Sequence, residues 1–200
     1  AGIGEAFMHA NGNRPVALER WPGGWREGMT LSVGPMGQQQ GDGFYSKRLP
    51  KGAPEWIETV RVTTPNRRPI DELLISEPAA AVWAAHMGTL TFHPWAVRAD
   101  DVEHPDELRI DFDPQPAATF ADVKRIAALA RDLFAELGIR AFVKTSGNRG
   151  VHVYVRIRPQ WTFEEVRHAA IGFGRELERR DSGITTNWWR EERPDTSVFL

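Results

Sequence analysis

The sequence predicts an α+β fold built on a mainly antiparallel sheet with flanking long helices. Alternating apolar and polar residues over 56–63, 108–113 and 151–157 predict strands. Apolar residues recur at helical spacing over 120–137 and 162–180, which predicts two amphipathic helices. The connections between strands are short, as in hairpins, and the regular strand–helix alternation of a parallel sheet is absent.

Capping residues mark the helix boundaries. Thr162 and Glu165 form a capping box at the start of the second long helix, and Gly138 follows the end of the first. A third helix is expected over 77–87, which is rich in alanine and has Pro78 in its first turn.

Shorter strands and one long loop complete the predicted fold. Residues 21–43 are rich in Gly, Pro and Gln and have no period, which predicts a loop, and 65–68 is a predicted turn. The remaining strands are expected over 14–20, 43–49, 70–75, 89–92, 141–144 and 197–200.

Composition excludes several classes of protein. The 200 residues (22.6 kDa) suit one domain or two small lobes, and no cysteine is present, which excludes zinc ribbons, thiol nucleophiles, iron–sulfur clusters and disulfide scaffolds. The net charge of −2 means that any contact with nucleic acid must be local. No apolar run approaches the ~20 residues of a membrane span, so no membrane partner is expected.

Two aspartates share one face of the predicted strand 108–113. Because side chains alternate along a strand, Asp111 and Asp113 point away from the face of Ile110 and Phe112. Like charges about 7 Å apart raise each other's pKa unless a cation neutralises them. Carboxylate oxygens of this kind suit Mg²⁺ or Mn²⁺. Taken alone, residues 111–113 are more typical of a strand end that faces solvent than of a metal site.

A loop with two glycines lies between the predicted strands 141–144 and 151–157. Its backbone N–H groups, together with Ser146 and Arg149, could hold phosphate oxygens. An ordinary hairpin turn with a polar rim is equally compatible with this pattern. His152 and Tyr154 follow on the polar face of the next strand, which we expect to be the face of the aspartates.

Three further segments favour structural roles when each is taken alone. His93, in the segment HPW, is a lone histidine of a kind that is more often structural than functional. Residues 44–48 interleave aromatic and basic side chains, as nucleic-acid surfaces do, but a half-buried strand is the simpler interpretation. Residues 188–193 (WWREER) are expected to pack in the core with salt bridges.

In their order along the chain, these motifs resemble the archaeo-eukaryotic primase superfamily. More specifically, the sequence resembles the polymerase domain of bacterial ATP-dependent DNA ligase D and its stand-alone actinobacterial relatives. The resemblance covers nearly the whole chain and rests on RPVALERWP, FYSKRLPKGAPEWI, LTFHPW, HPDELRIDFDP, KTSGNRGVHVYVRI and the final VFL.

The resemblance implies one primase-polymerase domain over 1–200, with an RRM-like sheet core. It further implies an N-terminal αβ lobe over about 1–95 and a catalytic core over about 96–200. Asp111 and Asp113 match the catalytic pair that binds two divalent ions, Mn²⁺ or Mg²⁺. The positions that match nucleotide contacts are His93, Lys144, Ser146, Arg149, His152, Phe44 and Tyr45, and those that match DNA phosphate contacts are Lys47, Arg48 and Lys51.

The activity implied by this resemblance is template-dependent nucleotidyl transfer in DNA repair, gap filling or end joining. The implied partners are a DNA template-primer or gapped duplex, nucleoside triphosphates (ribonucleotides preferred over deoxynucleotides), and end-joining or ligase proteins. The implied location is the bacterial cytoplasm, at the nucleoid during repair. Two alternatives stay open: a non-catalytic nucleotide- or DNA-binding module of the same fold, and a different metal phosphoesterase that uses the same aspartates.

Two departures from the family pattern affect these expectations. Glu19 stands where the family often has lysine, which removes one expected phosphate contact. The family's third metal carboxylate would follow Leu200, where the sequence ends. We therefore expect either a piece that is truncated at its C-terminus or a chain that does not complete the metal site.

Overall fold

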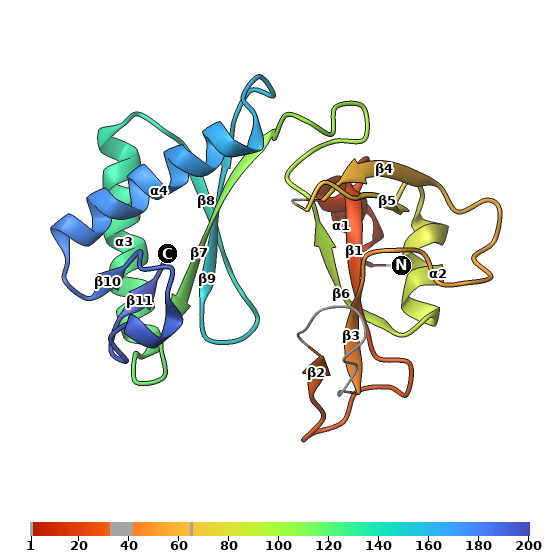
Figure 1. The fold of residues 1–200 in the computed structure, drawn as a ribbon, viewed down its shortest axis with the longest axis horizontal. Helices are drawn as coiled ribbons and strands as arrows, with labels where there is room; N and C mark the ends of the chain where they lie inside the picture. Colours follow the sequence, from red (N-terminus) through yellow and green to blue (C-terminus); the bar gives the residue numbers. More distant parts are fainter. Residues whose placement is uncertain (1, 33–41, 65) are drawn as a thin grey trace. The chain divides into compact units, whose positions relative to one another are not determined.

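The computed structural model describes residues 2–32, 42–64 and 66–200, which form two compact units. The first unit ends at Val102 and the second runs from Glu103 to Leu200. None of the helices in the described ranges is long and apolar enough to cross a membrane. Each unit has its own sheet and its own hydrophobic core (Figure 1).

The first unit contains a six-stranded sheet, in which the central strand β1 pairs with three neighbours. The order is β2-β3-β1-β5-β4, and β6 also pairs with β1; all pairs are antiparallel except β2 with β3. The elements are α1 (Gly4–Asn11), β1 (Pro15–Arg20), β2 (Leu31–Ser32), β3 (Gly43–Ser46), β4 (Thr59–Thr63), β5 (Pro69–Leu74), α2 (Pro78–His86) and β6 (Thr89–Pro94).

Alternation along β1 divides the first sheet into an apolar and a polar face. Val16 and Leu18 are buried with Leu73 of β5 and with the alanines of α2. Glu19 directly follows Leu18 on the strand, so its side chain points to the opposite, polar face.

That polar face also carries a carboxylate that is completely buried. Glu72 of β5 has no exposed surface, and its Oε2 accepts a hydrogen bond of 2.6 Å from Trp95 Nε1. Its Oε1 has no hydrogen-bond partner among the described residues. Burial raises the pKa of Glu72 to about 7, against the opposing effects of the Trp95 hydrogen bond and the charge of Lys47.

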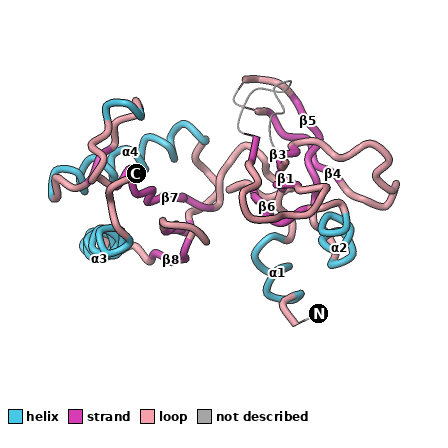
Figure 2. Tube along the Cα trace, turned by 90° about the horizontal axis from the view of Figure 1, so that it is seen from below, coloured by secondary structure: helices cyan, strands magenta, loops and turns pink. Residues whose placement is uncertain are grey.

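The second unit is a five-stranded sheet with two long helices on one face (Figure 1). The strand order is β10-β11-β7-β9-β8, antiparallel except for β10 with β11. Figure 2 shows α3 nearly end-on beside the sheet. The elements are β7 (Glu107–Pro114), α3 (Phe120–Glu136), β8 (Ala141–Thr145), β9 (Val151–Arg156), α4 (Phe163–Arg180), β10 (Ile184–Thr185), a short 3₁₀ helix η1 (Arg190–Glu192) and β11 (Val198–Phe199).

The second core forms where the apolar face of β7 and β9 meets α3 and α4. Ile110 and Phe112 of β7 are buried, as are the three valines of β9 at 151, 153 and 155. The predicted capping box of Thr162 and Glu165 is present at the start of α4. The predicted α+β class with a mainly antiparallel sheet is confirmed.

Several elements differ from the prediction. The strand expected over 56–63 begins only at Thr59, because a turn closed by the bond from Ile57 N to Pro54 O precedes it. The strand expected over 43–49 ends at Ser46, whose hydroxyl donates to the carbonyl of Arg48. Helix α1 and strands β2 and β10 were not expected from the sequence. Residues 33–41 of the loop expected over 21–43, and residue 65 of the expected turn, lie outside the described ranges.

The expectation that WWREER packs in the core is wrong. Trp188 and Trp189 are 70% and 65% exposed. The turn that carries them is held by polar contacts instead, because Trp189 N donates to Asn187 Oδ1 and the Arg193 guanidinium donates to the carbonyls of Asn187 and Trp188.

Replacing Gly150 should destabilise the second unit. A Cβ atom on Gly150 would lie 2.4 Å from the carbonyl oxygen of Phe112, so Gly150→Ala forces the β8–β9 hairpin away from β7. We expect the free energy of unfolding to fall by about 1–3 kcal/mol, measured by urea denaturation. Gly172→Ala is the matched control, since Gly172 lies in α4 with no atom within 4 Å of the added methyl group. It should raise stability by up to about 1 kcal/mol, and equal effects of the two variants would contradict this packing.

The buried carboxyl of Glu72 should make stability depend on pH. A folded-state pKa of about 7, above the usual 4.5, means that the folded protein holds this proton more tightly. The stabilisation is therefore complete at low pH and is lost as the pH rises from about 4.5 to about 7. The stability difference between wild type and Glu72→Gln should shift by roughly 2–3 kcal/mol over that range, measured by urea denaturation. Glu55→Gln, at an exposed position, is the control; parallel pH profiles for wild type and Glu72→Gln would refute the assignment.

Candidate functional site

The two predicted carboxylates stand on the open face of the second sheet. Asp111 and Asp113 are exposed on β7, on either side of Phe112, which is completely buried. Strand alternation therefore places both carboxylates on the face away from α3 and α4, as the sequence predicts.

Asp111 is surrounded by groups from β8 and β9. It pairs across the sheet with His152, whose Nε2 lies 3.5 Å from Asp111 Oδ1, and Lys144 pairs with His152 from the other side. Although Asp111 is exposed, the protein around it displaces part of its hydrating water and raises its pKa; the charge of Asp113 adds to this, while His152 and Lys144 oppose it. The carboxylate pair therefore favours the approach of additional positive charge.

Tyr154 extends this cluster on the same face, although the sequence alone assigns it no role. Its hydroxyl lies 3.4 Å from His152 Nδ1, so the imidazole is contacted on both nitrogens. The Arg109 guanidinium lies 5.4 Å from the centre of the Tyr154 ring and Lys144 Nζ lies 6.0 Å from it. His152 thus lies between the Tyr154 hydroxyl and the Asp111 carboxylate.

The glycine-containing loop is an ordered hairpin between β8 and β9. Ser146 N donates to the carbonyl of Gly150, and Ser146 Oγ accepts from the N–H groups of Asn148 and Gly150 at 3.3 and 3.1 Å. Gly147 has a φ of +91°, which favours glycine. The hairpin lies against the end of β7, since Gly150 approaches Phe112 closely. The geometry thus combines a tight turn with backbone N–H groups directed toward one hydroxyl.

Arg149 is occupied by backbone acceptors. Its Nη2 donates to the carbonyl of Ala118 at 2.5 Å, and to those of Gln115 and Pro116 at 3.3 to 3.4 Å. The side chain fastens the hairpin to the segment between β7 and α3. Its predicted contact with a triphosphate stays a prediction.

Arg193, in the segment expected to pack in the core, is a cation near the aspartates. Its guanidinium lies 3.3 Å from the centre of the Phe199 ring, and Phe199 pairs with Asp113 across β11 and β7. Burial lowers the pKa of Arg193, and the charge of Asp113 opposes this, so the two groups interact electrostatically. The sequence holds no signal for this contact, because the turn and β11 must first be placed beside β7.

The donor set fits a divalent cation in part. Asp111 and Asp113 supply hard oxygen ligands on one face, as Mg²⁺ and Mn²⁺ prefer. Across the ranges that the structure describes, however, no three His, Asp or Glu side chains are grouped so that they could hold a metal ion. The pair thus provides part of a metal site.

In the first unit, Glu19 organises the polar face around His93. Glu19 Oε1 accepts from Trp21 Nε1 at 2.8 Å, and Glu19 Oε2 lies 3.5 Å from His93 Nε2 without the geometry of a hydrogen bond. Tyr45 pairs with Glu19 across β3 and β1, and its ring meets the His93 ring edge-on at 5.1 Å. The residue that departs from the family pattern therefore contacts the predicted nucleotide ligand His93.

The structure separates the predicted aromatic pair of β3. Tyr45 lies on the polar face with His93, whereas Phe44 lies against Arg20, whose guanidinium is 5.4 Å from the centre of its ring. The three predicted phosphate-binding side chains, Lys47, Arg48 and Lys51, follow β3 in the next turn.

Comparisons of this chain with known proteins all point to the same family. The chain matches the family described as "LigD, primase-polymerase domain" over residues 1–200. It is 31% identical over 167 residues to the multifunctional non-homologous end joining protein LigD of Pseudomonas aeruginosa, covering 83% of this chain and 18% of that protein. It is 28% identical over 200 residues to the LigD of Mycolicibacterium smegmatis, covering 99% of this chain and 24% of that protein. The chain thus spans less than a quarter of either relative.

A solved structure shares the fold. The polymerase domain from Mycobacterium tuberculosis ligase D in complex with DNA superposes with a TM-score of 0.81 at 22% identity. The match covers 99% of this chain and 67% of that one. With the resemblance on the sequence motifs confirmed by the family match, the chain belongs to the primase-polymerase domain family of LigD.

Proposed function

We propose that this chain performs template-dependent nucleotidyl transfer, extending a primer in gap filling or end joining during DNA repair. The observation that carries the proposal is the cluster of Asp111, Asp113 and His152 on the open face of the sheet, beside the ordered hairpin at Ser146. Membership of the LigD primase-polymerase family gives this cluster its context.

The names of the relatives support the choice of partners. The relatives are named as end-joining proteins, and the solved relative is a polymerase domain in complex with DNA. We propose by extension that this chain binds a DNA template-primer or gapped duplex and nucleoside triphosphates, ribonucleotides in preference. End-joining or ligase proteins would be its partners, at the nucleoid of a bacterial cell. The two units would together form one primase-polymerase domain, with an N-terminal lobe over about 1–95 and a catalytic core over about 96–200.

The catalytic role of Asp111 and Asp113 would be to hold two Mn²⁺ or Mg²⁺ ions. Such ions lower the pKa of a primer hydroxyl and stabilise the charge of the triphosphate. The chain's own residues would position the nucleotide: His152, oriented by Tyr154, would donate to a phosphate oxygen, as would Ser146 and Lys144. Positioning supplies most of the catalysis in phosphoryl transfer.

The first unit would contact the nucleotide and the DNA backbone. His93, set between Glu19 and Tyr45, would bind the incoming nucleotide, with Tyr45 and Phe44 beside bases. The cations that would meet DNA phosphates are Lys47, Arg48 and Lys51.

One observation favours a second candidate, a non-catalytic nucleotide- or DNA-binding module. In the described ranges the aspartate pair has no third carboxylate grouped with it. Primer extension on a gapped duplex separates the two candidates, because only a polymerase lengthens the primer and releases pyrophosphate.

Asp111→Ala should abolish nucleotide incorporation. The substitution removes one of the two carboxylates that would hold the metal ions, so primer extension with Mn²⁺ should fall by about a hundredfold or more. Asp132→Ala, at an exposed position on α3, should leave the extension rate unchanged. Both are measured by gel analysis of a labelled primer. Extension by Asp111→Ala at the wild-type rate would refute the catalytic assignment, and nucleotide binding without extension by wild type would favour the second candidate.

Ser146→Ala should weaken nucleotide binding by about tenfold, because it removes a hydroxyl that would bond to a phosphate and that holds the hairpin N–H groups. Titration calorimetry with ATP or GTP in the presence of Mn²⁺ gives the affinity. Ser146→Thr keeps the hydroxyl and should retain most of the binding, and Ser182→Ala, an exposed serine after α4, should retain all of it. Equal affinities for wild type and Ser146→Ala would count against this role.

A further inference from the structure

The strand β8 forms one edge of the second sheet. In the order β10-β11-β7-β9-β8, it pairs with β9 and with no other strand in the described ranges. Its outer backbone N–H and C=O groups are therefore a template on which another strand can pair. The register with β9 is regular over all five residues, Ala141–Thr145, so no bulge turns this edge away.

Two of the five side chains of β8 are large, apolar and exposed. Phe142 and Val143 are 54% and 66% exposed, and Ile139, in the turn before β8, is 40% exposed. Native edge strands are usually protected from pairing by charge, proline or a bulge. Residues 139–145 contain two charges, Arg140 and Lys144, and no proline, and Lys144 pairs with His152, so its charge lies on the face of Asp111. Phe142 pairs with Tyr154 and therefore lies on the face of Asp111, so Val143 is the exposed apolar side chain of β8 on the helix side.

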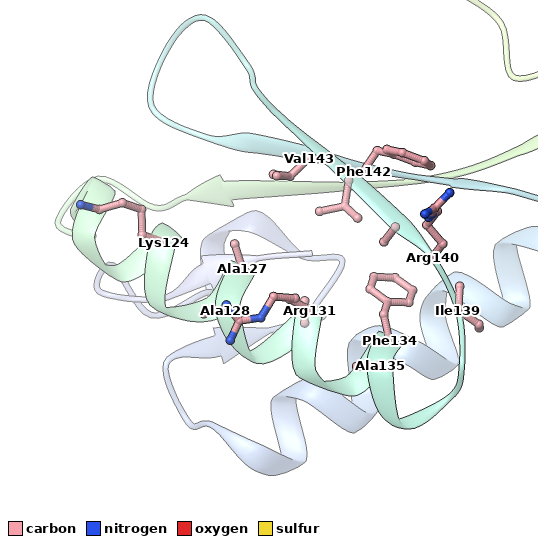
Figure 3. A pocket seen from close by; sticks show the side chains of 13 residues that line it. Lys124, Ala127, Ala128, Arg131, Phe134, Ala135, Ile139, Arg140, Phe142 and Val143 are labelled. Atoms are coloured by element: carbon pink, nitrogen blue, oxygen red, sulfur yellow. The ribbon is translucent and has the colours of Figure 1, made fainter.

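A groove runs alongside the edge, between α3 and β8 (Figure 3). Its volume is about 470 Å³. Ala127, Phe134 and Ala135 of α3 line it from one side, and Val143 of β8 from the other. Val143 pairs with the buried Val153 of β9, so it lies on the helix side of the sheet. A strand added at β8 would place every second side chain over this groove.

The charged residues that line the groove share one sign. Lys124, Arg131 and Arg140 are among them, and no acidic side chain is included in the lining from the described part of the chain, although Arg131 forms an ion pair of 2.7 Å with Asp132 beside it. Figure 3 shows these three cations around the groove. A ligand with carboxylates near its apolar side chains is therefore complementary, whereas a second copy of this chain would bring a second set of cations to the same place.

We propose that β8 and the groove beside α3 form a docking site for an extended peptide segment of a partner protein. The segment adds a strand to β8 through backbone hydrogen bonds. Apolar side chains at alternate positions fill the groove, and acidic side chains meet Lys124 and Arg140. The site lies on the helix side of the sheet, opposite to the face of Asp111.

Binding of synthetic peptides tests the site. A fluorescein-labelled peptide of about ten residues that alternates valine or isoleucine with glutamate should bind with a Kd below about 1 mM, measured by fluorescence anisotropy. The same peptide with lysine in place of each glutamate should bind at least tenfold more weakly, and so should one with a central proline. In the presence of the acidic peptide, the amide protons of β8 should exchange more slowly with solvent. Absence of binding by the acidic peptide up to about 1 mM would overturn the proposal.

Matched variants place the binding on β8. Val143→Asp should weaken binding of the acidic peptide at least tenfold, whereas Val82→Asp, at a valine of α2 that is 69% exposed, should leave it unchanged. Arg140→Glu tests the charges without touching the apolar surface and should also weaken binding. Equal affinity in wild type and Val143→Asp would refute the site. A wild-type dimer in sedimentation velocity that Val143→Asp dissociates would also overturn the proposal, because it would identify the occupant as a second copy.

Discussion

The alternation of side chains along β7 is the constraint on which the second unit depends. Ile110 and Phe112 are buried against the helices, and burial of each large apolar side chain stabilises the fold by about 1.5–3 kcal/mol. The same backbone turns Asp111 and Asp113 to the open face. A slip of one residue would exchange the two sets and bury two charges, at a cost well above that gain. The register that packs the core is therefore the same register that places the two carboxylates on the open face.

This constraint explains which part of the site the sequence predicts. The period of two in β7 and β9 is visible in the residues, and it correctly predicts that His152 shares the face of Asp111. The contacts of Arg149 and Arg193 could not be predicted from the alternation of apolar and polar residues. Arg149 meets carbonyls of the segment before α3, and the charge of Asp113 acts on Arg193 because β11 pairs with β7. Such contacts depend on the paths of turns, which local sequence does not specify.

The first unit shows what a residue that departs from a family pattern contacts in the fold. From the sequence, Glu19 is a lost phosphate contact. In the structure it is the acceptor for Trp21 and lies 3.5 Å from His93 Nε2, because β1 pairs with β3 and β6 at once. Those neighbours come from segments far apart along the chain, so their proximity could not be predicted from residues 14–20 alone. The substitution exchanges a positive group for one that can orient the histidine.

The two faces of β8 would let the sheet serve both proposed functions without interference. Val143 points to the helix side, while Lys144 belongs to the face of Asp111. A strand paired with the outer edge of β8 would therefore extend the sheet and leave the aspartate face uncovered. The same strand leads directly into the hairpin of Ser146, whose N–H groups are held by a single hydroxyl. Because edge strands fray more readily than central ones, a docked segment would restrain β8 and, through it, the hairpin.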